Sequence, residues 1–445
     1  MTNAATEQVS VKTLRKVIVA AGIGNFVEWF DFAVYGFLAT TIAQQFFPSG
    51  DASAALLKTF AVFAVAFAFR PLGGIFFGML GDRIGRKRTL AITILLMAAA
   101  TTLIGLLPTY AAIGVMAPVL LSLIRCAQGF SAGGEYAGAC AYLMEHAPSD
   151  KRAWYGSFIP VSTFSAFAAA AVVAYALEAS LSAEAMGSWG WRLPFLVAAP
   201  LGLVGLYLRW KLDETPAFQA VTQDHAVAHS PLKETLRNHG AAICCLGAFV
   251  SLTALSFYMF TTYFATYLQV AGGLTRATAL LVSLIALLFA AAICPLAGLY
   301  SDRVGRRMTV VTACVLLIVV VYPSFLMASS GSFAASIVGV MLLAIGAVLC
   351  GVVTAALLSE TFPTRTRYTA SAITYNMAYT LFGGTAPLVA TWLISTTGSN
   401  LSPAFYLIAV ALLALAGGLA LPETSRISLH DIAPRNNGAG VSATA

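Results

Sequence analysis

Five ionisable side chains lie well inside long apolar stretches of this sequence: Glu28, Asp31, Arg70, Arg125 and Glu135. A charge at the centre of a bilayer costs about 2.5 to 3.5 kcal/mol on insertion scales, so each of these residues needs a reason. The acids can exchange protons, whereas an arginine keeps its proton in a protein. If each arginine pairs with one acid, one acid has no basic partner, and burial then favours its neutral form. The chemistry this set could perform is proton binding and release.

Helical spacing would bring these residues together. Glu28, Asp31 and Tyr35 are spaced i, i+3, i+7 and share one helix face. At 1.5 Å per residue, four of the five charges lie about 15 to 21 Å from the inner ends of their helices, while the depth of Arg125 stays open. We expect proton coupling by Asp31 and Glu28 first and Glu135 third, with Arg70 and Arg125 as charge partners. The alternative is a static network of all five.

The elements that carry these residues are long enough to cross a membrane. The chain is 59% hydrophobic over 445 residues, far from the composition of a soluble domain. Crossing the bilayer takes roughly 20 helical residues, and unbroken runs exclude a barrel of alternating strands. Twelve runs predict an all-α membrane protein with twelve transmembrane helices at 17–44, 54–80, 89–108, 112–145, 153–179, 190–210, 240–270, 277–300, 308–328, 332–360, 368–397 and 402–421.

The distribution of Lys and Arg predicts the orientation. With both termini inside, 20 of the 25 basic residues fall in the tails and the even-numbered loops. This favours a multi-pass protein of the bacterial inner membrane with both termini cytoplasmic and no cleaved leader. The net charge of +7 is then a topology signal and not a sign of nucleic-acid binding. Seven cysteines and five histidines lack metal-ligand spacing, so we expect neither a metal nor a cofactor.

A charged motif occurs twice in the chain. "GDRIGR" at 81–86 is matched by "SDRVGR" at 301–306, and a Glu-x-x-Pro-x-x-x-Arg pattern begins at 145 and again at 360. Near-constant offsets predict two parallel six-helix halves at 1–211 and 240–421, a linker at 212–239 and a tail at 422–445. The alternative reading is a set of simple basic anchors. We expect a conformational latch made by Asp82, Arg83, Gly85, Arg86, Asp302, Arg303, Gly305, Arg306, Glu145, Arg152, Glu360 and Arg367.

These clusters resemble the signature of the major facilitator superfamily. Within it, "GNFVEWFDFAVYGF" (24–37), "GFSAGGEYAG" (129–138), "WGWRLPF" (189–195) and "DETPAF" (213–218) are similar to the metabolite:proton symporter family, and "FPTRTRYTASAITYN" resembles its proline and glycine betaine members. The resemblance covers almost the whole chain. It implies alternating access by the two halves, with a proton and a small solute as partners in the bilayer and no obligatory protein partner. The tail lacks heptads, which does not support osmotic control through a coiled coil.

Aromatic residues supply a second wall for a cavity between the halves. Ring faces attract quaternary ammonium groups and an opposing arginine holds a carboxylate, which suits a zwitterion such as proline or glycine betaine. The alternative is that these aromatic residues, which follow helical spacing, serve core packing or contact with lipid. A small carboxylate such as a dicarboxylate, 2-oxoglutarate or citrate is the second choice, and a transport-dead sensor is a remoter one. The sequence has no nucleotide loop and no deep histidine, so we expect no enzyme. Candidate substrate-binding residues are Tyr35, Gln128, Phe260, Tyr263, Tyr267, Tyr375, Asn376 and Tyr379.

Overall fold

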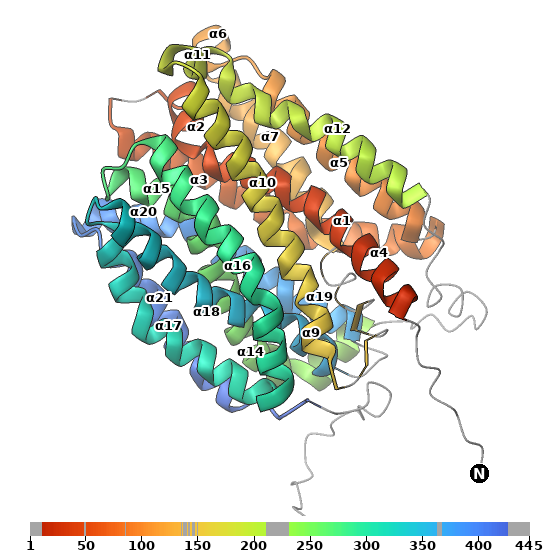
Figure 1. Ribbon diagram of the computed structural model, residues 1–445. Coiled ribbons are helices and arrows are strands. Elements are labelled where there is room, and N and C mark those ends of the chain that lie inside the picture. The colour runs from red at the N-terminus through yellow and green to blue at the C-terminus, as the bar shows by residue number, and fades with distance from the viewer. Residues whose placement is uncertain are drawn as a thin grey trace, which may run out of the picture.

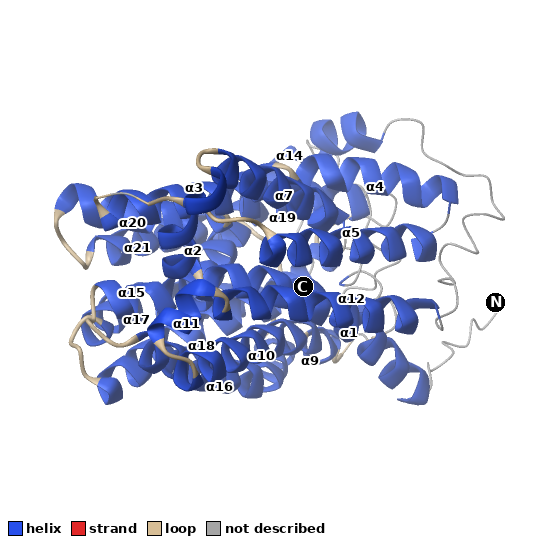
Figure 2. Ribbon diagram, turned by 90° about the horizontal axis from the view of Figure 1, so that it is seen from above, coloured by secondary structure: helices blue, strands red, loops and turns tan. Residues whose placement is uncertain are grey.

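The computed structural model describes residues 11–48, 50–84, 86–134, 136, 140, 143–144, 147–148, 150–210, 231–362 and 367–425. Throughout these ranges the chain forms helices joined by short turns, and no strand occurs in them (Figure 2). The turns after α15 (Phe264–Val270) and α20 (Ala386–Thr397) lie at the opposite end of the bundle from the beginning of α1 (Val11–Phe37) (Figure 2). We call the end with the repeated charged motifs the inner end and the other the outer end, following the predicted orientation.

The first half begins with two pairs of helices that each form one span. Its elements are α1 (Val11–Phe37), α2 (Ala39–Phe46), α3 (Ala52–Ala68), α4 (Arg70–Ile84), α5 (Arg86–Leu106), α6 (Tyr110–Ile113), α7 (Met116–Ser131), the 3-10 turn η1 (Ala132–Gly134), α9 (Arg152–Gly156), α10 (Phe158–Ser180), α11 (Ala183–Ser188), the 3-10 turn η2 (Gly190–Arg192) and α12 (Leu193–Trp210).

The second half contains two helices that are interrupted by a π-helical turn. Its elements are α14 (Pro231–Tyr258), the π-turn η3 (Met259–Tyr263), α15 (Phe264–Val270), α16 (Arg276–Val304), α17 (Arg306–Ala328), α18 (Phe333–Glu360), α19 (Arg367–Ala378), the π-turn η4 (Tyr379–Gly383), α20 (Ala386–Thr397) and α21 (Ser402–Leu419). In Figure 1 the red-to-yellow helices of the first half lie beside the green-to-blue helices of the second.

The predicted membrane spans are present in the described residues. Nine helices are long and apolar enough to cross a membrane, and the pair Gly22–Phe37 and Ala39–Phe46 forms a tenth. Two shorter apolar helices, Ala91–Leu106 and Met116–Ser131, fall in the two remaining predicted runs. Elements of each predicted run are therefore found, which confirms an all-α membrane protein.

Two of the predicted runs are not the straight helices that we expected. The first span bends by 63° between α1 and α2. The run predicted at 112–145 is interrupted near its start, because Gly114 adopts φ +58° between α6 and α7. A residue with a Cβ rarely takes that conformation, so the glycine ends the short helix. The length of an apolar run predicts that a segment crosses the membrane, but it does not predict local breaks in the helix.

Glycines allow close approach of helix backbones at two places in the bundle. A Cβ on Gly129 would lie 1.6 Å from the carbonyl oxygen of Ala66, so α7 and α3 touch through backbone. A Cβ on Gly298 would lie 2.7 Å from the carbonyl oxygen of Ala153, which joins α16 of the second half to α9 of the first. Small residues are the usual means of close packing between membrane helices. These contacts position the charged residues described next.

Candidate functional site

Arg70 lies at the point where α3 gives way to α4 and is completely buried. Its Nη2 lies 3.5 Å from Oε1 of Glu28 and donates a hydrogen bond of 3.3 Å to the carbonyl oxygen of Ala132. Its guanidinium carbon lies 5.4 Å from the ring centre of Phe67 and 5.7 Å from that of Phe32. The expected approach of the first, second and fourth spans is therefore seen at Arg70, with Glu28 as its acid partner.

Arg125 occupies a second buried position on α7. Its guanidinium carbon lies 4.3 Å from the ring centre of Tyr35 and 5.0 Å from that of Phe63. Nη1 donates to Oε1 of Gln128 at 2.7 Å, while Nε and Nη2 have no hydrogen-bond partner. No acid of the described residues lies within ion-pair distance of it. Its depth, which the sequence left open, is thus beside the first two spans, in the interior of the half.

Asp31 is the acid of this region without a basic partner in the described part of the chain. The residue is 1% exposed, and neither carboxylate oxygen has a hydrogen-bond partner. Glu28 on the same helix and Thr101 of α5 are its polar neighbours. We call Glu28, Asp31, Arg70 and Arg125 the buried charge site. Glu135, the third predicted carrier, lies outside the described residues.

Two predicted substrate residues are held in place by contacts within the first half. The hydroxyl of Tyr35 donates to the carbonyl oxygen of Thr59 at 2.9 Å, and its ring lies under Arg125. Gln128 accepts from Arg125 through Oε1 and donates from Nε2 to the hydroxyl of Thr101 at 2.6 Å. Both side chains therefore orient Arg125.

The aromatic stripe of the second half divides between two environments. Phe260 packs on the ring of Phe164 across the two halves, and Tyr263 packs on Phe60 with ring centres 6.1 Å apart. The ring of Tyr267 packs on that of Tyr263 with ring centres 6.0 Å apart, while its hydroxyl donates to the carbonyl oxygen of Asn400 at 2.9 Å. Its hydroxyl therefore serves contacts within the second half.

The eleventh span meets the first half through a stack of tyrosines. Tyr375 stacks on Tyr136 with ring centres 4.5 Å apart and on Tyr379 at 3.9 Å. The side chain of Asn376 donates to the carbonyl oxygen of Gly133 at 3.0 Å. These residues are brought together as a contact between the halves.

One residue of this region was missed by the sequence reasoning. Tyr258 is completely buried at the end of α14, and its hydroxyl has no hydrogen-bond partner. Its ring centre lies 5.1 Å from that of Phe67 and 6.2 Å from that of Trp29, and it is within electrostatic reach of Arg70. Tyr258 precedes the π-turn η3, which shifts the helix face by one residue. A regular 3.6-residue periodicity could not place it with Phe260 and Tyr263.

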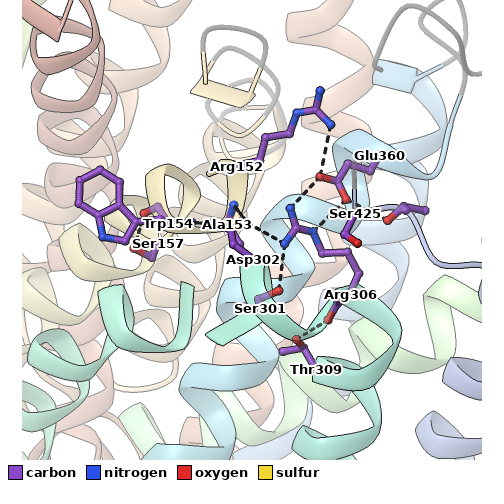
Figure 3. A network of polar contacts seen from close by, with 12 residues as sticks. Arg152, Ala153, Trp154, Ser157, Ser301, Asp302, Arg306, Thr309, Glu360 and Ser425 are labelled. Carbon is purple, nitrogen blue, oxygen red and sulfur yellow. Dashed lines mark hydrogen bonds and ion pairs between the residues drawn. The ribbon is translucent and has the colours of Figure 1, made fainter. Parts of the chain in front are cut away.

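A second cluster of polar side chains lies at the inner end (Figure 3). Arg306 pairs with both oxygens of Glu360, through Nε at 3.0 Å and Nη2 at 3.1 Å. Its Nη1 donates to Oδ1 of Asp302 at 2.9 Å. Arg152 of the first half lies 3.7 Å from Glu360. We call Arg152, Asp302, Arg306 and Glu360 the inner cluster.

Asp302 joins the two halves through the start of the fifth span. Its two carboxylate oxygens accept from the backbone N–H groups of Ala153 at 3.0 Å and Trp154 at 2.9 Å (Figure 3). The first N–H groups of a helix have no partner within it, and a negative charge there is favourable. The inner cluster therefore holds the inner ends of the halves together in this structure.

The other predicted latch residues differ in where they lie. Gly305 sits in the tight turn between α16 and α17 with φ +93°, a conformation that favours glycine. Arg303 is exposed and forms no hydrogen bond or ion pair with any described residue. The rest cannot be compared, because Gly85 and Glu145 and the side chains of Asp82, Arg83, Arg86 and Arg367 lie outside the described residues.

The start of α17 is capped by an acid that the sequence reasoning did not assign a role. Glu423, after α21, accepts from the backbone N–H of Arg306 at 2.8 Å and of Arg307 at 3.1 Å. Burial opposes its charge, but these backbone hydrogen bonds and that of Ser425 outweigh it and lower the pKa of Glu423 below its ordinary value. The sequence signal that could have found it is the repeat of "ETP" at 214–216 by "ETS" at 423–425.

A separate set of polar contacts joins the halves at the outer end. Arg276 at the start of α16 bonds to the hydroxyl of Thr41 at 3.2 Å and to Oε1 of Gln44 at 3.1 Å. Glu178 of α10 lies 3.9 Å from Arg276. We call these four residues the outer cluster. The halves are thus connected by polar contacts at both ends.

Comparison with known proteins agrees with this architecture. The model of the Major Facilitator Superfamily matches residues 21–387 and 295–441. The "Proline/betaine transporter" of Salmonella typhimurium is 38% identical over 431 residues, which cover 95% of this chain and 86% of that protein. The "Glycine betaine/proline/ectoine/pipecolic acid transporter OusA" of Dickeya dadantii has the same identity and coverage.

Solved structures agree on the fold. The proton:xylose symporter XylE bound to 6-bromo-6-deoxy-D-glucose superposes with a TM-score of 0.73 at 19% identity. The match covers 95% of this chain and 99% of that one. At this level of identity the likeness shows the twelve-helix fold and no more.

Proposed function

Because this chain belongs to the Major Facilitator Superfamily, we propose that it is a proton-coupled symporter that imports a small zwitterion such as proline or glycine betaine by alternating access. The observation that carries the proposal is a buried acid and a buried arginine in one half, Asp31 and Arg125, neither with an ion-pair partner among the described residues. Ionisable groups inside a membrane protein cost free energy, and those that are present usually serve a function such as proton or substrate binding. The relatives named for proline and betaine transport support the same solute class.

Asp31 is the proton carrier in this proposal. An acid without a neighbouring cation takes up a proton readily when buried, whereas Glu28 is stabilised in its charged form by Arg70 at 3.5 Å. Glu28 therefore ranks second. Arg125 is the carboxylate-binding group, because its Nε and Nη2 can donate two parallel hydrogen bonds to the two oxygens of a carboxylate.

The aromatic side chains near Arg70 form the opposite wall. Trp29, Tyr258 and Phe67 lie around the guanidinium of Arg70, and Tyr379 is close to Tyr258. Ring faces of this kind attract a quaternary ammonium group. In the proposal these residues replace Tyr267, whose hydroxyl is bonded within the second half. Phe260, Tyr263, Tyr375 and Asn376 stay candidates on the wall where the halves meet.

A small carboxylate is the second candidate solute. Arg70 also carries buried N–H groups, at Nε and Nη1, without hydrogen-bond partners. A dicarboxylate such as 2-oxoglutarate could engage both arginines. We place the protein in the bacterial inner membrane with both termini cytoplasmic, because the basic residues gather in the tails and even-numbered loops.

Uptake into proteoliposomes under an imposed proton gradient tests the proposal. Labelled glycine betaine, proline and 2-oxoglutarate are compared with the outside acidic and with the gradient collapsed. We expect accumulation of glycine betaine or proline only while the gradient lasts. Accumulation of 2-oxoglutarate alone would reverse the ranking of solutes. Binding without accumulation of any of them would support a transport-dead sensor.

A further inference from the structure

We propose that Thr101 and Gln128 form a hydrogen-bond bridge that transmits the proton occupancy of Asp31 to the guanidinium of Arg125, so that proton binding favours binding of the solute carboxylate. The inference rests on the proposed function and deepens it. It assigns a coupling role to Thr101, a residue that no sequence pattern singled out. Thr101 is a positioning residue in this scheme, since it touches neither the solute nor the surrounding water.

The bridge is continuous in the structure. Arg125 Nη1 donates to Oε1 of Gln128 at 2.7 Å, and Nε2 of Gln128 donates to the hydroxyl of Thr101 at 2.6 Å. The amide orientation is determined by chemistry, because an arginine has donors only and must face the amide oxygen. All three side chains are at most 1% exposed. Water therefore does not compete for these hydrogen bonds.

The far end of the bridge has a choice of acceptor. The Thr101 hydroxyl has a single proton, which it donates to the carbonyl oxygen of Met97 at 3.0 Å. The carboxylate of Asp31 lies beside the same hydroxyl and is a second acceptor within reach of that proton. An ionised carboxylate is a much stronger acceptor than a main-chain carbonyl that already accepts within its own helix, so the hydroxyl should turn to Asp31 when that residue is charged.

Ionisation of Asp31 would align the whole bridge. With the hydroxyl turned to the carboxylate, every donor from Arg125 to Thr101 points from the cation toward the anion. Such chains polarise one another, and each bond becomes stronger. Arg125 is then held in the bridge and its charge is compensated at a distance. When Asp31 binds a proton, the hydroxyl returns to Met97, and Arg125 is left to find a negative partner in the solute.

No other described charge competes for this role. Glu28 shares the helix face of Asp31 and is paired with Arg70. Among the helices that pack on α1, α10 contributes Glu178, which is at the outer end with Arg276. Neither arginine of the buried charge site lies within ion-pair distance of Asp31. The bridge is therefore the polar connection in the described chain between Asp31 and Arg125.

The coupling is reciprocal by thermodynamic necessity. If a proton on Asp31 raises the affinity for the carboxylate, the bound carboxylate raises the proton affinity of Asp31 by the same factor. Proton and solute then load together, which is the requirement for symport. Removal of the Thr101 hydroxyl should break the coupling and leave both binding sites in place.

Equilibrium binding of glycine betaine to the purified full-length protein, measured from about pH 5 to about pH 8, tests the bridge. The wild-type protein should bind glycine betaine at least about fivefold more tightly at the acid end of this range. Neither charged group of glycine betaine titrates in this range. In Thr101→Val the Kd should no longer depend on pH, gradient-driven accumulation should fall to the equilibrium level, and counterflow exchange should persist. Thr101→Ser restores the hydroxyl and should restore the pH dependence.

The neighbouring Thr102→Val is the matched control. The hydroxyl of Thr102 donates only to the carbonyl oxygen of Ala98 at 2.7 Å, so this variant should behave as wild type. A wild-type pH dependence in Thr101→Val would overturn the bridge. So would a loss of binding at every pH that Thr101→Ser does not repair, since that result assigns Thr101 to packing. A wild-type protein that imports glycine betaine with no response to pH or gradient would refute the proposed proton coupling itself, and the bridge with it.

Discussion

At the scale of single residues, side chains with the same carboxyl group have different surroundings because of what lies across from them. Glu28 and Asp31 are one helical turn apart on α1 and both are buried. Glu28 faces a guanidinium at 3.5 Å, while Asp31 faces a hydroxyl. An acid beside a cation stays charged, and an acid in an apolar neighbourhood favours its neutral form. The neighbouring helices therefore determine which of the two acids is paired with a cation and which is not.

Replacement of Asp31 tests this division. In Asp31→Asn the residue cannot release a proton, so accumulation driven by a proton gradient should be lost while downhill exchange of solute persists. Uptake and counterflow in proteoliposomes measure the two activities separately. Asp51→Asn, at the exposed N-cap of α3, is the control and should transport as wild type, because asparagine also caps a helix. Normal accumulation by Asp31→Asn would remove this residue as the carrier.

At the scale of elements, the beginning of α17 depends on a residue more than a hundred positions away. Gly305 allows the turn from α16 but has no side chain with which to cap the new helix. Glu423 supplies the missing acceptor for the N–H groups of Arg306 and Arg307. The segment after the last helix is thereby tied to the inner cluster, where Thr424 also donates to Glu360 at 2.9 Å.

Loss of this cap should cost about 1 kcal/mol of stability, as for other helix N-caps. Because the pKa of Glu423 is lowered by folding, its stabilisation is complete above the ordinary pKa of 4.5 and is lost as pH falls through the lowered value. Glu423→Gln should therefore unfold at a lower temperature than wild type at neutral pH, and the difference should shrink as the pH falls below about 4.

Thermal unfolding in detergent as a function of pH measures both effects. Glu184→Gln, in the exposed first turn of α11, is the control and should shift the midpoint little at any pH. A Glu423→Gln deficit that stays constant down to the acid end would show that the carboxylate charge is not what stabilises α17.

At the scale of the whole molecule, two clusters at opposite ends hold the halves together. The inner one depends on Asp302 at the start of the fifth span, and the outer one on Arg276. Alternating access requires that each be released in turn. The two clusters share no residue, so each can be weakened without touching the other.

Weakening one cluster should open that end. Asp302→Ala should populate a state that is open at the inner end, and Arg276→Ala one that is open at the outer end. Spin labels at Lys151 and Met308 report the inner separation, and labels at Ser180 and Val270 the outer one. Arg303→Ala is the control next to Asp302, and it should change neither distance. Equal distances in all three variants would show that these clusters do not set the conformational balance.

The membrane spans and the contact between Asp302 and Arg306 could be predicted from the sequence alone, because they depend on the length of apolar runs and on a repeated motif. Apolar runs of bilayer length predicted the twelve helical spans, and the repeat of "DRVGR" predicted that Asp302 and Arg306 act together at one corner. Both are local properties: burial in lipid is decided residue by residue, and a turn with a glycine brings its neighbours into contact.

Which charges meet was decided only by the tertiary structure. The charge count did not identify the excess acid. The tertiary structure brings Arg70, the first residue of α4, within 3.5 Å of Glu28 and places Asp31 beside Thr101. The π-turn η3 placed Tyr258 at the centre, and a distant chain segment placed Glu423 over α17. A charge interacts with whatever lies within a few ångströms in space. That neighbourhood comes from helix packing between segments far apart in the chain, and no spacing along the sequence records it.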